Sequence, residues 1–328
     1  MRSLALAFAA AALFAAPALH AAPGDPPSSS PAEPPALSPV QQARTGIVQV
    51  EQQGRPMAVG IVLDKDGRIV TALSALGTAE QADVRYADGT VVRAKLAHKD
   101  ASWDLALLVP QAGKWLEGLV PTTADPSVVE LRAYLPNHGR LELSPLTYKG
   151  RVDAVAKDGT ALKSALDLDA KGLPTVPGAP VLDPNGKVTG VFVRACKSSE
   201  GDAPKKAPKC TPTTVAAPVY ALRAFLIKTP PKAALPAPWL GLGGAPAQGP
   251  VKGVKVMGLA PGSPAEKGGL KAGGDKPDVI VAVDGQPVEN PDQLAKAIAK
   301  FSVGQTVKLL VFGDGRFREV PVTLRAAP

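Results

Sequence analysis

The chain has 328 residues, of which 45% are hydrophobic and 4% aromatic, and its formal net charge is +8 at pH 7. This length allows two domains with separate cores. The basic residues are scattered and the aromatic residues are too sparse for a base-stacking platform, which argues against nucleic-acid binding. No Cys/His/Asp grouping has metal-ligand spacing and no glycine run resembles a phosphate-binding loop, so we expect neither a metal nor a cofactor.

The first 21 residues are typical of a signal peptide. Arg2 precedes the apolar run "LALAFAAAALFAA" and small residues follow it, so we expect cleavage near Ala21 or Ala22. This run is short for a membrane span and no later segment is longer, so no transmembrane segment is predicted. Residues 22–39 are rich in proline and predict a semi-extended tether. We therefore expect an exported protein, either periplasmic or secreted.

Cys196 and Cys210 are the only two cysteines, and an oxidising compartment favours a disulfide between them. Closing a loop of about 15 residues would stabilise the fold by roughly 3 kcal/mol. A redox-active pair is the alternative, but such pairs usually have the CxxC spacing, which this chain lacks.

Residues 40–228 carry short apolar or alternating runs separated by turns, which predicts a β-sandwich or barrel. The stretches "GIVLDKDGRIVTA" (60–72) and "APVLDPNGKVTGV" (179–191) share a hairpin pattern, which suggests two similar half-domains. Apolar residues at helical spacing over 218–228 predict a helix that closes this region. The turn dipeptides are Asp66-Gly67, Asp88-Gly89 and Asn185-Gly186.

Residues 229–238 are rich in proline and predict a linker to a C-terminal domain at 239–328. That domain has three strand-like runs and one helix. We expect the helix to begin with Asn290 as its N-cap and Pro291 at its first position, and Gln293 to complete a capping box.

Three blocks of the middle region resemble the active-site blocks of HtrA/Deg-type periplasmic serine proteases: "VGIVLDKDGRIVTALSAL", "DGTVVRAKLAHKDASWDLALL" and "LDLDAKGLPTVPGAPVLDPNGKVTGV". The C-terminal "GVKVMGLAPGSPAEKGGLKAG" and "DVIVAVDGQPV" are similar to the PDZ domain that follows such proteases. The resemblance covers nearly everything from Ile47 to Leu324. It implies a mainly β chain with a trypsin-like double β-barrel followed by a small α+β PDZ domain.

The resemblance also maps the catalytic triad onto this chain. Ser74 stands in the place of the family's histidine, Asp104 in "DASWDLA" retains the aspartate, and Pro177 stands in the place of the nucleophilic serine. Proline has no side-chain oxygen and no backbone N–H. The backbone N–H of the nucleophile is one of two oxyanion donors in this class, so a proline at this position removes both the nucleophile and one donor. A serine hydroxyl is not basic enough to replace the histidine. The sequence therefore predicts an inactive serine protease homologue with no intact catalytic residue.

Other side chains offer no replacement for the triad. His98 is expected at the end of a strand and His138 in a turn, where both are ordinary structural positions. Ser102 lies two residues before Asp104, on the wrong side of the frame to attack a substrate.

The PDZ resemblance implies a groove in which a peptide adds as a strand and its terminal carboxylate meets backbone N–H groups. The carboxylate-binding loop maps to the segment that begins at Trp239, and the groove helix carries apolar residues that either face the ligand or belong to the core. The segment after this loop, "GGAPAQGP", is broken by Pro246, which predicts a weak ligand-pairing strand. The residues assigned to the groove are Leu240, Gly241, Leu242, Leu294 and Ile298.

The old substrate cleft of the double barrel is a second candidate surface, because it could hold an extended chain against a strand edge. We therefore expect an exported pseudoprotease that binds proteins or peptides and modulates protein quality control or an active protease. A serine-type endopeptidase with a non-standard residual site and a structural scaffold of the envelope are the alternatives. A second copy of the chain and an active protease are the expected protein partners, although no trimer-forming segment is recognisable in the proline-rich arm.

Overall fold

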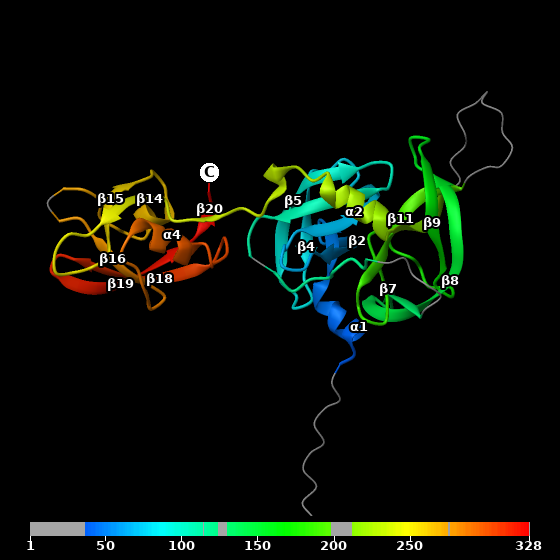
Figure 1. Cartoon of the computed structure of the whole chain (residues 1–328), viewed down its shortest axis with the longest axis horizontal. Helices are drawn as coiled ribbons and strands as arrows, with labels where there is room; N and C mark the ends of the chain where they lie inside the picture. The colour runs from blue at the N-terminus through cyan, green and yellow to red at the C-terminus, as the bar shows by residue number, and fades with distance from the viewer. Residues whose placement is uncertain (1–36, 114, 124–129, 198–211, 275, 328) are drawn as a thin grey trace, which may run out of the picture. The chain divides into compact units, whose positions relative to one another are not determined.

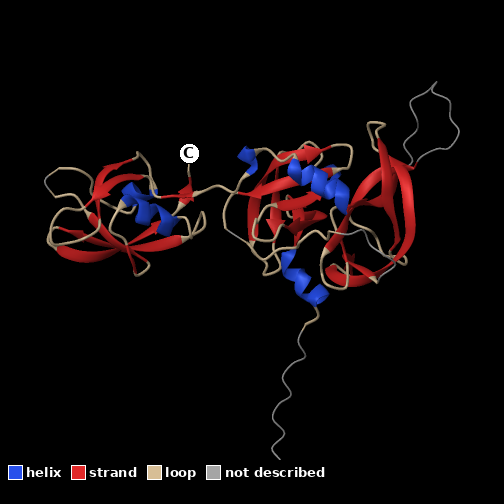
Figure 2. Ribbon diagram, in the orientation of Figure 1, coloured by secondary structure: helices blue, strands red, loops and turns tan. Residues whose placement is uncertain are grey.

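The computed structural model describes residues 37–113, 115–123, 130–197, 212–274 and 276–327 (Figure 1). The predicted signal peptide, nearly all of the predicted tether and Cys210 lie outside the described residues. Strands dominate the described part and its helices are short (Figure 2). None of these helices is long and apolar enough to cross a membrane. The predicted mainly β fold is confirmed.

Six antiparallel strands close the first barrel, in the order β1-β2-β3-β6-β5-β4. The short helix α1 (Pro39–Gln42) and the 3₁₀ turn η1 (Ala43–Gly46) precede this barrel, and the 3₁₀ turn η2 (Leu73–Ala75) follows β3. Its strands are β1 (Ile47–Gln52), β2 (Arg55–Val62), β3 (Ile69–Ala72), β4 (Gln81–Arg85), β5 (Val91–Asp100) and β6 (Leu105–Pro110).

Six further strands close the second barrel, in the order β10-β11-β12-β9-β8-β7. The predicted closing helix is present as α2 (Val219–Ile227), and the 3₁₀ turn η3 (Pro231–Ala233) follows it. The strands are β7 (Leu131–Asn137), β8 (Arg140–Val155), β9 (Ala161–Asp169), β10 (Pro180–Leu182), β11 (Val188–Lys197) and β12 (Pro212–Pro218).

The two barrels have the same topology, because the order β4-β5-β6-β3-β2-β1 becomes that of the second barrel when six is added to each number. The expectation of two similar halves is therefore correct. The hairpins that suggested it are nevertheless not equivalent, since they are β2–β3 and β10–β11, and β10–β11 corresponds to β4–β5. Their shared sequence reflects what any apolar hairpin with a glycine turn needs, and not a repeated position.

A continuous apolar core joins the two barrels. Ile61 of β2, Val181 of β10 and Phe225 of α2 are each at most 1% exposed and belong to the same buried cluster. Burial of side chains of this size contributes about 1.5–3 kcal/mol each. Loops that end at this joint are therefore held by close packing on both sides, which fixes the backbone around the candidate site.

The C-terminal domain is built on one antiparallel sheet in the order β14-β15-β16-β18-β19, with β17 paired to β16 and a separate pair β13–β20. Its core is a buried cluster of its own that includes Val256, Ile280 and Leu309. The elements are β13 (Pro238–Trp239), β14 (Leu242–Pro246), β15 (Val254–Leu259), α3 (Pro264–Lys267), β16 (Val279–Val283), β17 (Gln286–Pro287), α4 (Pro291–Ile298), β18 (Thr306–Gly313), β19 (Arg316–Thr323) and β20 (Arg325–Ala326).

The predicted start of α4 is confirmed, but its cap differs in detail. The Asn290 side chain accepts a hydrogen bond from the Gln293 N–H at 2.9 Å, and Pro291 is the first helical residue. The Gln293 side chain does not reach back to Asn290, because it accepts the N–H of Glu289 at 2.8 Å. The cap thus satisfies the N–H of the residue before the N-cap in place of the N–H of the N-cap itself.

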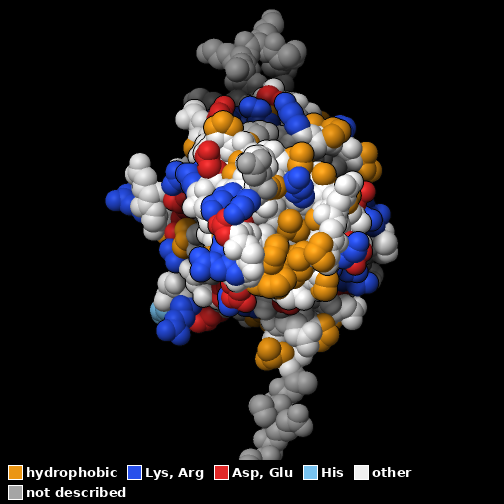
Figure 3. Space-filling view, turned by 90° about the vertical axis from the view of Figure 1, so that its left-hand side faces the viewer, with side chains coloured by type: hydrophobic (Ala, Val, Ile, Leu, Met, Phe, Trp, Pro, Cys, Tyr) orange, Lys and Arg blue, Asp and Glu red, His pale blue; other side chains and the backbone are white. Residues whose placement is uncertain are grey.

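One face of the C-terminal sheet is apolar and open to solvent. Val279, Phe312 and Phe317 lie opposite one another in β16, β18 and β19, so their side chains share a face. Phe317 is 56% exposed, and its ring centroid lies 5.0 Å from that of Phe312. Figure 3 shows one face of the molecule, on which hydrophobic side chains gather between Lys and Arg side chains.

Candidate functional site

The three residues aligned with the triad lie at the joint between the two barrels. Ser74 is in η2, directly after β3, and Asp104 directly precedes β6, the strand that pairs with β3. Pro177 precedes β10, and its carbonyl accepts a hydrogen bond from the N–H of Val59 in β2 at 3.1 Å. The structure therefore brings together the positions that were aligned from sequence.

Asp104 is a buried carboxylate that receives three hydrogen bonds. Ser74 donates its N–H to Oδ1 at 2.6 Å and its hydroxyl to Oδ2 at 2.8 Å, and the N–H of Arg194 in β11 reaches Oδ2 at 2.9 Å. Asp104 is 7% exposed and adopts the left-handed backbone conformation, with φ +53°. Burial raises the pKa of Asp104 above its ordinary value, and the bonds from Arg194 and Ser74 oppose this rise without cancelling it.

The side chain that Asp104 holds in place is a serine hydroxyl. The Ser74 hydroxyl, at the position that the sequence resemblance aligns with the family's histidine, uses its proton in the bond to Asp104. An alcohol has no lone pair basic enough to accept a proton near neutral pH. Within the described residues, no hydrogen bond joins either histidine to Asp104, so the carboxylate acts here as a structural acceptor.

The loop in front of β10 is fixed by its backbone. Gly178 has φ +82°, and a Cβ atom there would clash with the carbonyl oxygen of Val59 and lie 2.6 Å from Oγ1 of Thr71. That hydroxyl donates to the same Val59 carbonyl at 2.8 Å. Pro177 itself is buried, and it has no N–H to offer to a developing oxyanion. The loop therefore makes a sharp turn directly after Pro177, the position that the sequence resemblance aligns with the family's nucleophile.

The edge of β11 on the side opposite β12 is largely occupied. Phe192 exchanges two hydrogen bonds with the loop 178–179, at 2.7 and 2.9 Å. The N–H of Arg194 is held by Asp104, and residues 196–197 pair with the end of β8. The expectation that the old cleft binds an extended chain along a free strand edge is therefore not met along this stretch of β11.

The other candidate side chains have structural roles. His98 lies in β5, and its ring stacks on that of Phe225 with centroids 4.8 Å apart. His138 is exposed in the turn between β7 and β8, with φ +46°. The N–H of Ser102 donates to Oδ1 of Asp100 at 2.9 Å, within the turn that leads to Asp104. Both histidines therefore occupy the ordinary positions expected for them.

The proposed carboxylate loop, Leu240 to Leu242, is anchored on the start of α3. The carbonyls of Leu240 and Gly241 accept the N–H groups of Ala265 and Ala260, each at 2.9 Å. Gly241 has φ +77°, and a Cβ atom there would clash with Ser263. The loop is therefore fixed before any ligand arrives, and α4 lies beside the adjoining strand β14.

Three of the five predicted groove residues belong mainly to the core. Leu240 is 6% exposed, and Leu294 and Ile298 are each 5% exposed within the buried cluster of the C-terminal domain. Of the two alternatives left open for the α4 residues, the core is the one observed. Leu242 is partly buried against the same cluster, at the first position of β14.

Strand β14 forms and Pro246 is its last residue, so the strand ends where the sequence indicated a break, and its weak pairing with a ligand stays a prediction. The N–H of Ala247 donates to the carbonyl of Gly253, so the Pro246–Val254 pair next to it is a non-hydrogen-bonded pair. The backbone of Pro246 thus faces the free edge of the sheet, where its missing N–H breaks no bond to β15. Gly244, two residues earlier, presents a complete N–H and C=O at the same edge.

Cys196 is buried near the end of β11, whereas Cys210 lies outside the described residues, so the disulfide stays a prediction. Within the described part of the chain, no group of three or more His, Cys, Asp or Glu side chains could hold a metal ion.

Comparison with known proteins identifies both parts of the chain. Residues 58–191 match the family model of the trypsin-like peptidase domain, and residues 255–311 match that of the PDZ domain. The chain is 27% identical over 288 residues to the "Probable periplasmic serine endoprotease DegP-like" of Brucella suis biovar 1 (strain 1330), which covers 84% of this chain and 54% of the relative. The chain belongs to the HtrA/Deg-type family.

Other HtrA/Deg-type relatives give the same picture. A protein of the same name from Chlamydia muridarum (strain MoPn / Nigg) is 28% identical over 302 residues, covering 86% of this chain and 58% of the relative. The chain thus spans little more than half the length of these relatives. The solved structure "HtrA-type protease AlgW with decapeptide" aligns over 89% of this chain at 17% identity, with a TM-score of 0.41, which is too low to support an inference.

Sequence reasoning missed the residues that engage Asp104 and β11 in this HtrA-type chain. The partner of Asp104 in β11, Arg194, lies 90 positions away and contributes only its backbone N–H, which any residue but proline could supply. The bonds between Phe192 and the loop 178–179 are also purely backbone. A backbone contact between distant segments leaves no residue type to recognise, so no motif could have indicated either one.

Proposed function

We propose that this chain is a catalytically inactive HtrA-type protein that acts by binding peptides or proteins through its PDZ domain. The observation that carries the proposal is the pair of substitutions at the triad, Pro177 for the nucleophile and Ser74 for the base. Base, nucleophile and one oxyanion donor are missing together, and the loss of a single oxyanion donor already costs about 10²–10³ in rate.

The hydrogen bonds of Asp104 support this reading. A carboxylate that accepts two bonds from Ser74 and one from Arg194 has its acceptor positions engaged by the fold. Its raised pKa also disfavours the charge that would stabilise a protonated base. The alternative is a serine-type endopeptidase with a non-standard site, and the names of the relatives favour it.

The PDZ domain supports the binding role. Its carboxylate loop is fixed by Leu240 and Gly241, and β14 is an edge strand with α4 beside it. Gly244 offers a full N–H and C=O to an added strand. A periplasmic location, modulation of an active protease, and assembly with a second copy of the chain are part of the same proposal. The periplasmic relatives and the apolar N-terminal run motivate the location.

Hydrolysis of an unfolded protein tests the inactive reading. Purified protein, a Ser74→Ala, Asp104→Ala double variant and an active DegP-like relative would be incubated with casein, and the fragments counted by mass spectrometry. We expect the relative alone to cleave. Cleavage by the unmodified chain that disappears in the double variant would establish the endopeptidase alternative.

A peptide array tests the binding role separately. Peptides of varied sequence would be presented once with free carboxyl ends and once with amidated ends. We expect binding to the free ends only, and loss of that binding with Leu242→Lys in the loop. Phe317→Lys, on the open outer face of the same sheet, is the matched control and should bind as the unmodified chain does. Equal binding of free and amidated peptides would contradict the PDZ groove proposal.

A further inference from the structure

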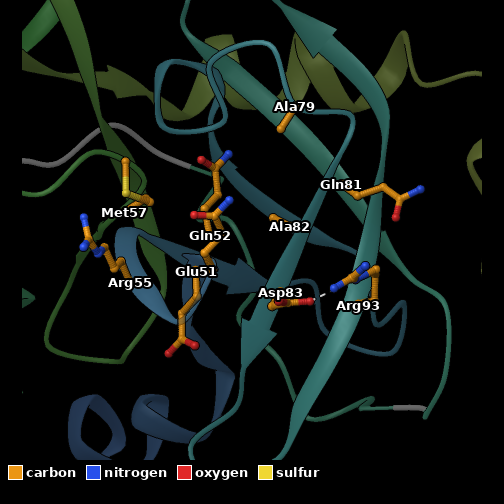
Figure 4. Close-up of a pocket in the computed structure, with 10 residues that line it drawn as sticks. Glu51, Gln52, Arg55, Met57, Ala79, Gln81, Ala82, Asp83 and Arg93 are labelled. Atoms are coloured by element: carbon orange, nitrogen blue, oxygen red, sulfur yellow. Dashed lines mark hydrogen bonds and ion pairs between the residues drawn. The ribbon is translucent and has the colours of Figure 1, made fainter.

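The first barrel contains a cavity of about 450 Å³ that no triad or PDZ residue lines. Figure 4 shows side chains from β1, β2, β4 and β5 around it, with Met57 and Arg55 on one side of the view and Gln81 and Arg93 on the other. Its volume lies in the range of known ligand pockets, about 300–1,000 Å³.

The cavity is open because the pairing between the neighbouring strands β1 and β4 stops before β4 reaches its first residue. β1 pairs with β4 only as far as Glu51 opposite Asp83. The next residues of β1 enter a two-residue hairpin turn, in which Gln53 and Gly54 have φ values of +51° and +74°. Strand β4 begins two residues before Asp83, at Gln81, so its first two residues pair with β5 but have no partner on the side of β1.

The backbone of Gln81 faces this opening. The N–H of Leu96 donates to the carbonyl of Glu80, so the Gln81–Lys95 pair between β4 and β5 is a non-hydrogen-bonded pair. The N–H and C=O of Gln81 therefore point away from β5, toward the side of β1. Within the described residues neither group has a hydrogen-bond partner, because the ladder with β1 has already ended.

A single residue with a free N–H and C=O on one strand edge matches a peptide backbone. An added segment can donate one hydrogen bond to the Gln81 carbonyl and accept one from its N–H, as paired antiparallel residues do. The ladder end is rigid, since the Glu51 carboxylate, 5% exposed, is bound by Arg85 at 2.6 Å. The Gln52 side chain also donates to the carbonyl of Leu76 at 2.9 Å.

The walls define which side chains the segment would carry. Met57 is 44% exposed and offers an apolar contact. Arg93 is already paired with Asp83 at 3.0 Å. Among the described residues, no carboxylate lies within ion-pair range of Arg55, so its charge is available to an acidic side chain.

We propose that this β1–β4 cavity binds an extended peptide segment through the backbone of Gln81, with an acidic side chain on Arg55 and an apolar one on Met57. The segment needs no free carboxyl end, because the cavity offers an internal strand edge and not a carboxylate loop. This separates the site from the PDZ groove, and its existence does not depend on the proposed function.

The probe is the blocked pentapeptide acetyl-Val-Glu-Val-Glu-Val-amide. Because its apolar and acidic side chains alternate, it can place both kinds of side chain in the cavity whichever of its residues pairs with Gln81. It would be titrated into the full chain while the backbone amide resonances are followed by NMR. We expect shifts at Gln81, Ala82 and Met57. The peptide acetyl-Val-Gln-Val-Gln-Val-amide should bind about tenfold more weakly, as the loss of one charge-assisted contact implies. Shifts confined to the PDZ domain, or none at millimolar peptide, would overturn the proposal.

Two variants and one control variant locate the contacts. Gln81→Pro removes the N–H that faces the cavity at the first residue of a strand, where proline is tolerated, and should weaken binding about tenfold. Gln81→Ala keeps the N–H and should bind normally. Arg55 lies in β2, so Arg55→Glu leaves β4 unchanged and should abolish the preference for the glutamate peptide. This result would test the site even if Gln81→Pro disturbs β4. Unchanged affinity in Gln81→Pro together with an unchanged preference in Arg55→Glu would refute the site.

Discussion

The hydroxyl of Ser74 donates to Oδ2 of Asp104 at 2.8 Å, and its N–H donates to Oδ1 of the same carboxylate at 2.6 Å. If Ser74 replaces the family's histidine, as the sequence resemblance implies, a hydroxyl too weakly basic to accept a proton near neutral pH is bound to the aspartate in its place. The contact contributes to the packing of the joint between the barrels.

We expect Ser74→Ala to lower the free energy of unfolding by about 1 kcal/mol, because it removes one hydrogen bond to a buried carboxylate and keeps the backbone bond. Urea unfolding at pH 7 measures the change. Ser102→Ala is the matched control, since only the backbone N–H of Ser102 is engaged in the same region. Equal stability of both variants would mean that the Ser74 hydroxyl adds nothing to the fold.

The pH dependence of stability should reveal the burial of Asp104. Because burial raises its pKa in the folded state, the stability linked to its protonation is complete below the ordinary value of 3.8 and is lost as the pH rises through the raised value. We expect the unfolding free energy of the unmodified chain to fall relative to that of Asp104→Asn between about pH 3 and pH 7. Chemical unfolding across this range measures the difference.

Asp153 provides a control of opposite sign. The Lys163 side chain and the Ser164 N–H lower the pKa of this exposed carboxyl. The unfolding free energy of the unmodified chain should therefore rise relative to that of Asp153→Asn as the pH rises through the same range. If Asp104→Asn behaved like Asp153→Asn, the hydrogen bonds to Asp104 would outweigh its burial.

Gly178→Ala should destabilise the protein by more than about 2 kcal/mol, because a left-handed conformation and a clash with the Val59 carbonyl act together. Gly159→Ala isolates the first effect. Gly159 has φ +88°, and a Cβ atom added there would have nothing within 4 Å, so its substitution should cost only about 1 kcal/mol. Urea midpoints for the two variants measure the comparison, and equal midpoints would show that the loop can move away from Val59.

Leu294→Ala should destabilise the PDZ domain by about 2–5 kcal/mol, since Leu294 is 5% exposed within the core. Lys296→Ala, exposed on the same helix, should leave the stability unchanged. Thermal unfolding followed by circular dichroism distinguishes the two. If Leu294→Ala were as stable as Lys296→Ala, Leu294 would not belong to the core, and the alternative that it faces the ligand would be favoured.

The sequence predicted the parts of this molecule that depend on residue type. Apolar runs separated by Asp-Gly and Asn-Gly turns indicated strands, and motif order indicated the two barrels and the PDZ domain. Ser74, Asp104 and Pro177 could be aligned with the family's triad, and the structure places them at one joint. These features are local, so each leaves a readable pattern.

The features that the sequence did not predict depend on backbone pairing between distant segments. The cavity exists because β1 enters its hairpin turn where the first two residues of β4 still need a partner. No residue type indicates such a difference in strand length. The sequence indicated a weak strand around Pro246, but it did not indicate that the nitrogen of Pro246 faces the free edge of β14, away from β15. The burial of Leu294 likewise depends on which way α4 sits on its sheet.

The orientation of Pro246 also limits the length of peptide that the PDZ groove could hold by backbone hydrogen bonds. Next to the carboxylate loop, Gly244 can exchange two hydrogen bonds with an added strand, but at Pro246 only a carbonyl remains. A bound tail would be held firmly over its last few residues and loosely before them. Such a groove distinguishes partners by how they end and is indifferent to the rest of their sequence, so one receptor could serve many unrelated chains that share a terminus.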